Sequence, residues 1–302
     1  MTTWKTTTTK MIDVAGTSFA YRELGEVGGV PVVFLHHFTA VLDDWDPRVL
    51  DGVASRHHVI AFDNRGVGGT GGRVPADIER MGADAIAFIR TLGYEQVDLF
   101  GFSLGGAVAQ MVALQAPDLV RRMVLAGTGP RGGGGIWKMP FIVGGAYTKA
   151  LLARKDPRHF LFFPRTAEGK RAATAYFDRL AERVTGRDEP ISAQAGLAQL
   201  RAITSAGLHS ADDLSRITIP VLVANGDKDL MVASAHSKDM GARLPDSRLR
   251  IYPGSGHGAV FQFHQEFVPE VLDFLGSSSG RGREGDPEST PGVVRGPSGN
   301  GV

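Results

Sequence analysis

The chain has 302 residues, a formal net charge of +1 and no cysteine. This length suits one large core with an insertion better than two independent domains, because single cores rarely grow past about 250–300 residues. The near-zero charge gives no electrostatic reason to expect nucleic acid as a partner. The lack of cysteine excludes disulfides, thiolate chemistry and cysteine-based metal sites.

The N-terminal residues 1–10 have no apolar run and no small-residue cleavage site, so they do not read as a secretory signal. No stretch approaches the roughly 18 apolar residues that a membrane span requires. The sequence therefore predicts a soluble, cytoplasmic protein with no membrane partner.

The first predicted element is a hairpin over residues 11–24. Apolar residues alternate up to Ala15-Gly16 and alternate again after it, as in two short strands joined by a glycine turn. We expect this hairpin to form an antiparallel edge of a larger sheet.

Continuous apolar runs with turn signals at their ends follow the hairpin. Such runs are typical of strands buried on both faces of a parallel sheet, since crossover helices cover each side. Helical spacing lies between them, most clearly over residues 78–92 and 104–116. The alternation predicts an α/β fold with a doubly wound, mostly parallel sheet. The runs cover residues 31–36, 58–63, 97–101, 123–126 and 220–224.

The alternation breaks over residues 131–215, where helical spacing dominates and no strand-like run occurs. Thr166 can cap one of these helices. We interpret this region as an inserted helical lid on a core formed by residues 11–130 and 216–275. Its aromatic residues either hold the lid onto the core or, as proposed for Trp137, line a substrate pocket. Residues 276–302 are rich in Gly, Pro, Ser and charge, and predict a disordered tail.

The strongest local signal is the pentapeptide Gly101-Phe-Ser103-Leu-Gly105, which stands between a buried strand and a helix. A serine on such a sharp turn needs small neighbours, because side chains there would collide with the tight backbone. The helix N-terminus that follows favours an oxyanion. Ser103 is therefore the candidate nucleophile.

A serine hydroxyl needs a base and an orienting acid before it reacts. Both follow in the sequence. Asp227 and Asp229 lie in a loop after the strand at 220–224, and the residues alone hardly separate them. His257 lies in a glycine-bounded loop between a strand at 248–252 and a terminal helix at 260–275, and is the best candidate for the base.

These motifs together resemble the α/β-hydrolase superfamily, across nearly all of residues 11–275. The closest branch is that of small lidded esterases and lactonases, including cofactor-free haloperoxidases or perhydrolases. The resemblance implies no metal and no cofactor, and its spacing favours Asp229 as the acid. The strings that carry it are Gly-Phe-Ser-Leu-Gly-Gly from Gly101, Asp63-Asn-Arg-Gly-Val-Gly-Gly-Thr70, Gly226-Asp-Lys-Asp229 and Gly256-His257.

In this family one oxyanion donor is the backbone N–H after the nucleophile, here Leu104. The other comes from a loop usually written His-Gly-x, which here reads His36-His37-Phe38, so that Phe38 supplies it. His37 departs from the pattern, since glycine would turn with less strain. His37 is either a tolerated substitution or a hydrogen-bonding group at the pocket, and His36 and His37 are both candidate pocket residues.

The predicted function is hydrolysis of a small carboxylic ester or lactone through an acyl-enzyme. Three alternatives remain open. The same residues suit perhydrolase chemistry, in which hydrogen peroxide replaces water. A lid arginine such as Arg154 or Arg165 could clamp the carboxylate of a substrate for carbon–carbon bond hydrolysis. A non-catalytic ligand receptor is the third alternative.

Overall fold

The computed structural model describes residues 2–277 and contains one eight-stranded sheet with the order β1-β2-β4-β3-β5-β6-β7-β8. Pairings from β4 to β8 are parallel, and those of β2 with β1 and β4 are antiparallel. The predicted α/β fold class is confirmed. The strands are β1 (Lys10–Val14), β2 (Thr17–Leu24), β3 (Val32–Leu35), β4 (Val59–Phe62), β5 (Val97–Phe102), β6 (Val120–Ala126), β7 (Val221–Gly226) and β8 (Ser247–Tyr252).

The edge hairpin forms as predicted, with Val14 paired to Thr17. Ala15 and Gly16 both take positive φ, 50° and 80°. Two left-handed residues in a two-residue loop match the twist of the strands on either side, and glycine adopts this conformation without steric cost.

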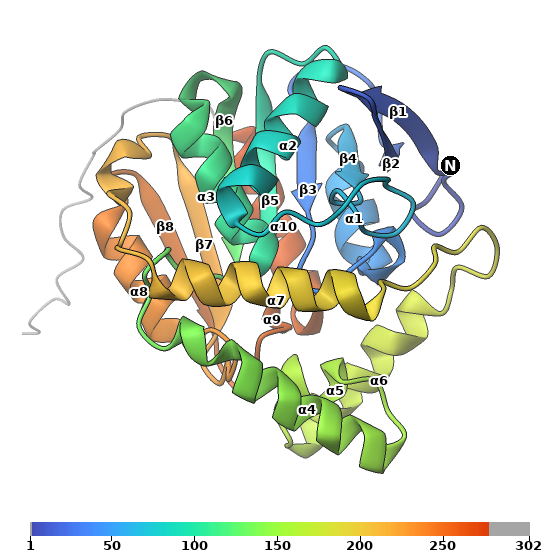
Figure 1. The fold of residues 1–302 in the computed structure, drawn as a ribbon, viewed down its shortest axis with the longest axis vertical. Helices are drawn as coiled ribbons and strands as arrows, with labels where there is room; N and C mark the ends of the chain where they lie inside the picture. The colour runs from blue at the N-terminus through green and yellow to red at the C-terminus, as the bar shows by residue number, and fades with distance from the viewer. Residues whose placement is uncertain (1, 278–302) are drawn as a thin grey trace, which may run out of the picture.

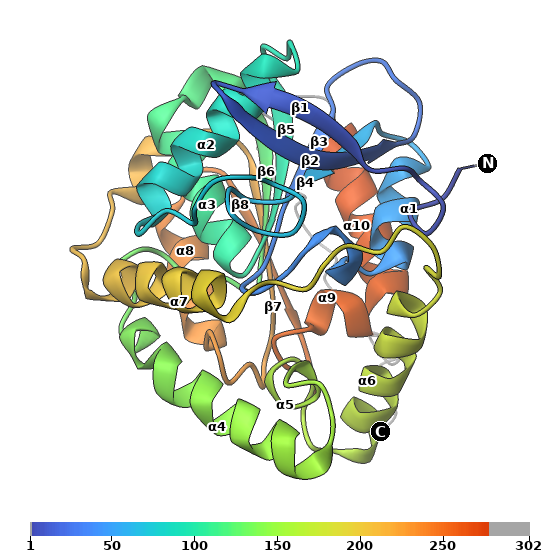
Figure 2. The same ribbon diagram turned by 45° about the vertical axis from the view of Figure 1, so that its right-hand side comes forward.

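Helices cover both faces of the sheet (Figures 1 and 2). On one face lie α1 and α10, which contact each other, and on the other lie α2, α3 and α8. Every residue of β3, β4, β5 and β7 is buried between these layers, which explains their unbroken apolar runs. These helices are α1 (Pro47–Ala54), α2 (Ile78–Thr91), α3 (Leu104–Gln115), α8 (Ser234–Arg243) and α10 (His264–Gly276), and the short helix α9 (Ala259–Gln262) precedes α10.

The connection from β6 to β7 contains four α-helices and no strand, and lies across the end of the sheet where β5, β6 and β7 terminate (Figure 2). The Thr166 hydroxyl accepts a hydrogen bond from the Gly169 N–H at 3.1 Å, so the predicted cap forms. The helices are α4 (Met139–Ala153), α5 (Arg158–Leu161), α6 (Ala167–Leu180) and α7 (Ala193–Leu208).

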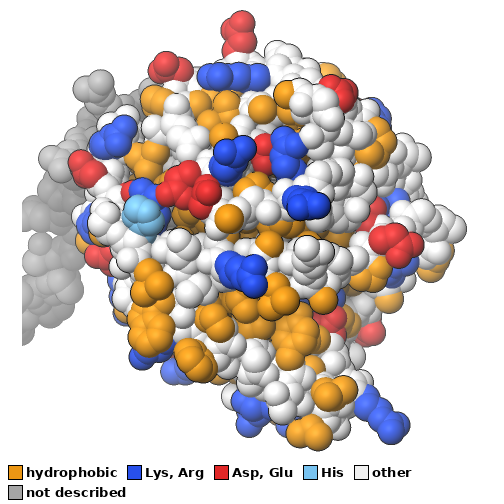
Figure 3. All heavy atoms as spheres, viewed as in Figure 1, with side chains coloured by type: hydrophobic (Ala, Val, Ile, Leu, Met, Phe, Trp, Pro, Cys, Tyr) orange, Lys and Arg blue, Asp and Glu red, His pale blue; other side chains and the backbone are white. Residues whose placement is uncertain are grey.

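The outward surface of α4 is largely apolar (Figure 3). Its packed residues Val143 and Ala146 are buried, but Phe141, Leu151 and Leu152 are each at least 75% exposed. The helix is therefore apolar on all sides, without the polar face of a typical surface helix.

The C-terminal end of the fold differs slightly from the predicted boundary. The helix α10 continues through Gly276, one residue into the segment predicted to be disordered. The rest of that segment, from residue 278 onward, lies outside the described residues. Between residues 2 and 277, no helix has both the length and the apolar character to cross a membrane.

Candidate active site

Ser103 stands on a strained turn between β5 and α3, with φ 56° and ψ −116°. Its flanking glycines are sterically required. A Cβ on Gly105 would lie 1.9 Å from the Leu35 carbonyl oxygen, and one on Gly101 would lie 2.5 Å from the carbonyl oxygen of Gly105. The turn can therefore form only with glycine at these positions, as the pentapeptide predicted. A strained backbone of this kind is commonly found at functional sites.

His257 and Asp229 form a buried hydrogen-bonded pair. The Nδ1–H of His257 donates to Asp229 Oδ2 at 2.7 Å, and both side chains are fully buried. The other carboxylate oxygen, Oδ1, accepts the backbone N–H groups of Met231 at 2.7 Å and Val232 at 3.0 Å. These bonds fix the carboxylate, which in turn fixes the ring so that Nδ1 is protonated and Nε2 carries the lone pair.

The Nε2 atom of His257 has no hydrogen-bond partner among residues 2–277. His257 and Ser103 line the same cavity. The structure therefore brings together the serine, the histidine and Asp229, although no Ser103–His257 hydrogen bond is formed. Such a bond is often long in unliganded enzymes and tightens around the substrate.

The structure separates the two candidate acids. Asp227 is exposed and its carboxylate lies 3.6 Å from the Lys228 ammonium. Only Asp229 contacts His257.

The candidate oxyanion donors, Leu104 and Phe38, line the same cavity as Ser103. Leu104 is the first residue of α3, so its N–H has no partner within the helix. Phe38 lies in the loop after β3 and, like Ser103, lines two cavities. Its carbonyl accepts hydrogen bonds from the His37 ring at 2.9 Å and from the Thr39 hydroxyl at 2.7 Å. These two bonds hold the loop in place.

This loop tolerates histidine at position 37 because the left-handed residue is Thr39, with φ 61°, and not His37. The His37 ring packs in a T-shaped arrangement against the rings of Phe102 and Phe162, at centroid distances of 5.4 and 5.1 Å. Burial lowers the pKa of His37 to about 3, so the ring is neutral at physiological pH. Since the ring nitrogen Nδ1 donates to the Phe38 carbonyl, Nε2 is an acceptor without a partner in the described part of the chain.

His36 and Trp137, predicted as pocket residues, lie outside both cavities that Ser103 lines. His36 directly follows β3 and is fully buried in the core. The centroid of its ring lies 5.9 Å from that of Trp45. Trp137 is 42% exposed and lies beneath the Lys138 ammonium. Its neighbours Ile136 and Met139 line the smaller cavity instead. For these two residues the pocket prediction is not supported.

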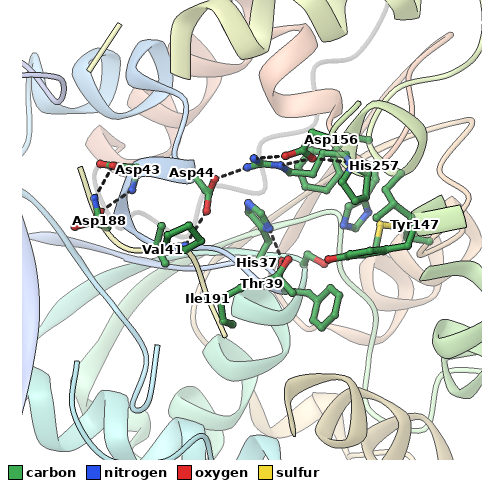
Figure 4. Close-up of a pocket in the computed structure, with 18 of the residues that line it drawn as sticks. His37, Thr39, Val41, Asp43, Asp44, Tyr147, Asp156, Asp188, Ile191 and His257 are labelled. Carbon is green, nitrogen blue, oxygen red and sulfur yellow. Dashed lines mark hydrogen bonds and ion pairs between the residues drawn. The ribbon is translucent and has the colours of Figure 1, made fainter. Parts of the chain in front are cut away.

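Ser103 lies where the two cavities meet. The larger, whose wall is shown in Figure 4, has a volume of about 310 Å³ and carries six charged side chains. The smaller has a volume of about 50 Å³ and a mainly apolar wall. The charged residues of the larger cavity, none of which the sequence singled out, are Asp43, Asp44, Asp156, Arg158, Arg187 and Asp188. They come from three separate segments, and no local motif marks them.

The sheet order, the serine at the turn after β5 and the buried aspartate–histidine pair are those of an α/β fold with a candidate serine active site. A family model described as "alpha/beta hydrolase fold" matches residues 30–263. The chain therefore belongs to the α/β-hydrolase family, whose members are hydrolytic enzymes.

Similar proteins agree with this assignment. A protein titled "Alpha/beta hydrolase fold protein from Chitinophaga pinensis" has a solved structure with a TM-score of 0.86 and 35% identity, covering 92% of this chain and all of the other. A "Non-heme haloperoxidase" of Rhodococcus erythropolis and a "Non-heme chloroperoxidase" of Streptomyces lividans are each 29% identical, covering 87% of this chain and 97% of their own length.

Proposed function

We propose that this protein is a serine hydrolase that cleaves a small carboxylic ester or lactone through an acyl-enzyme. The observation that carries the proposal is the buried His257–Asp229 hydrogen bond, which leaves His257 Nε2 without a partner in the cavity that Ser103 lines. A histidine held in this tautomer can accept the proton of an alcohol.

In the proposed reaction His257 Nε2 takes the Ser103 proton as the oxygen attacks the carbonyl carbon. The N–H groups of Leu104 and Phe38 stabilise the oxyanion of the tetrahedral intermediate. The histidine then gives its proton to the leaving alkoxide, and the acyl group stays on Ser103. Water, deprotonated by the same histidine, releases the acid and restores the serine.

The direct test is hydrolysis of p-nitrophenyl butyrate by the Ser103→Ala variant. We expect loss of turnover, whereas Ser55→Ala, at an exposed serine after α1, should keep the wild-type rate. Wild-type activity in Ser103→Ala would refute the assignment.

Perhydrolase activity is a second candidate, favoured by the haloperoxidase names of the relatives. It needs the same acyl-enzyme, with hydrogen peroxide in place of water. Peracid formed from acetate and peroxide in wild type but not in Ser103→Ala would support it.

The structure gives no support to a carboxylate clamp by Arg154 or Arg165. Both are exposed and neither lines the cavities around Ser103. The lid arginines that do line the larger cavity, Arg158 and Arg187, lie beside carboxylates, so we do not favour carbon–carbon bond hydrolysis. A non-catalytic receptor is tested by a fluorophosphonate, which should label Ser103 in an enzyme and leave a receptor unlabelled.

We also propose that residues 131–215 act as a lid. This segment supplies part of the cavity wall opposite Ser103, including Tyr147, Leu161 and Phe162. The core, residues 11–130 and 216–275, supplies the proposed catalytic residues.

A further inference from the structure

The position of His257 identifies the leaving-group side of the site, if the proposed function holds. His257 lines the larger cavity and not the smaller one. The histidine must protonate the leaving oxygen, so the leaving group has to lie within reach of its Nε2. The alcohol part of an ester therefore occupies the larger cavity, which leaves the smaller cavity for the acyl chain.

The smaller cavity fits a short apolar acyl chain. Its volume is about 50 Å³ and its wall is built mainly from buried apolar side chains. A charged or long acyl group would have to displace this wall. The apolar side chains that close it include Ile136, Met139, Ile203 and Val232.

The larger cavity is rich in hydrogen-bond acceptors. Its wall contains four carboxylates and two guanidinium groups. Arg158 uses its donors on neighbouring acids, with Nε and Nη2 bonded to Asp156 at 2.9 and 2.8 Å and Nη1 bonded to Asp44. The other cation, Arg187, is half exposed and lies 3.7 Å from Asp43. The wall therefore carries an excess of negative charge, and both arginines already lie beside carboxylates. An anionic leaving group would bind poorly in this cavity.

His37 adds an acceptor in the same cavity. The residue is only 2% exposed, and its Nδ1–H donates to the Phe38 carbonyl. The lone pair on Nε2 has no partner within residues 2–277. A buried polar atom of this kind is costly unless a ligand or a water supplies a donor.

We propose that the preferred substrates are esters of a short apolar acid with an alcohol that carries a further hydrogen-bond donor, and that His37 Nε2 is the acceptor that selects for this donor. The donor is either a second hydroxyl or an ammonium N–H. In this role His37 is a specificity-determining residue, and the bond-breaking steps remain those of Ser103 and His257.

The test compares kcat/KM for butyrate esters that share the acyl group. Propyl and 2-hydroxyethyl butyrate have the same number of heavy atoms and differ by one donor. The pair of 3-methylbutyl and 2-(dimethylammonio)ethyl butyrate tests an ammonium donor in the same way. We expect kcat/KM for at least one donor-bearing ester to exceed that for its apolar partner by about fivefold. One net hydrogen bond in the transition state gives a ratio of this size. Carboxymethyl butyrate should be the poorest substrate.

The His37→Phe variant keeps an aromatic ring against Phe102 and Phe162 but has no acceptor. We expect the ratio of donor-bearing to apolar ester to fall to about one. Comparing two esters within one variant cancels any general loss of rate from the altered loop. His159→Phe is the matched control, because His159 lies in α5 outside the cavity and should leave the ratio unchanged.

A wild-type ratio near one for both pairs, or a preference that persists in His37→Phe, would overturn the inference while ester hydrolysis itself continued. Failure of the proposed function would look different, since no ester in the set would be hydrolysed in a Ser103-dependent way.

Discussion

At the scale of single residues, two aspartates of one loop differ sharply in their surroundings. Asp229 is buried and bonded to His257 and to two backbone N–H groups, whereas Asp227 faces solvent. The sequence places both after β7 and its chemistry hardly separates them. The two residues differ in the burial of their carboxylates and in their hydrogen-bond partners. Both properties depend on how the loop after β7 folds over the edge of the sheet.

This contrast gives a paired prediction. Asp229→Asn should reduce kcat by about 10³–10⁴-fold, because the amide no longer holds the tautomer that leaves Nε2 free. Asp227→Asn should change kcat by less than about twofold, since an exposed carboxylate beside a lysine contributes little. Steady-state kinetics with p-nitrophenyl butyrate decide between them, and equal losses in both variants would contradict the assignment of Asp229.

The buried His37 predicts a dependence of stability on pH. Its pKa is about 3 in the folded protein and about 6.5 in an unfolded chain. Below pH 6.5 the unfolded state therefore binds a proton that the folded state does not, so stability falls as pH falls towards 3, with no such effect above 6.5.

The measurement is the free energy of unfolding of wild type and His37→Phe in urea. When the pH falls from 7 to 5, the wild type should lose about 2 kcal/mol of unfolding free energy relative to His37→Phe, because the variant lacks the titrating group. The variant His209→Phe, at an exposed position after α7, shows what loss of a surface imidazole does. A pH-independent difference for His37→Phe would mean that the ring is not buried as described.

At the scale of elements, α7 lies across the sheet and closes the smaller cavity with Ile203. Ile203→Ala should enlarge that cavity and raise the ratio of hexanoate to butyrate hydrolysis by about tenfold, since each buried methylene contributes about 0.8 kcal/mol. Leu197→Ala, on the exposed side of the same helix, is the control. If Ile203→Ala left the ratio of hexanoate to butyrate hydrolysis unchanged, the smaller cavity would not be the site of the acyl chain.

The strands were more predictable than the helices. The buried strands stand out as apolar runs because helices cover both faces, and the hairpin turn is marked by Gly16. The helix α4 has no such signal, because it is apolar all round and shows no periodic stripe. The terminal helix predicted over 260–275 is two helices, which break at Phe263.

At the scale of the whole molecule, a buried ionic cluster joins the core to the segment between α6 and α7. Arg22 on β2 donates to Asp43 at 2.7 Å and to Asp188 at 2.8 Å, and its side chain is fully buried. Asp43 and Asp188 also bond to each other's backbone N–H groups. Asp188 lies in the wall of the larger cavity, so this cluster holds that wall in place.

Arg22→Met should destabilise the protein by about 3 kcal/mol, because it removes the one cation that bonds both buried carboxylates and leaves Asp188 without its ion pair, whereas Asp43 keeps Arg183 at 3.2 Å. Arg48→Met removes an exposed pair with Glu182 and should cost less than about 1 kcal/mol. Urea unfolding measures both. If the two variants lost similar stability, the cluster would not hold the segment to the core.

The sequence located the candidate catalytic residues but not the substrate cavity. Ser103 and His257 each lie in a short motif whose glycines indicate a tight turn or loop at that position. The cavity wall combines His37, Asp44, Arg158 and Asp188 from three distant segments, and their positions depend on how the connection between β6 and β7 folds over the sheet. Trp137 shows this limit, because it is 42% exposed and lines neither cavity, although Ile136 and Met139 beside it line the smaller one.

The central claim is that Ser103 becomes acylated through His257. Mass spectrometry of the protein quenched during turnover of p-nitrophenyl butyrate tests it most directly. We predict a butyryl adduct on the peptide that contains Ser103 in wild type and none in Ser103→Ala or His257→Ala. Turnover with no adduct on that peptide, or with an adduct on another residue, would contradict the account.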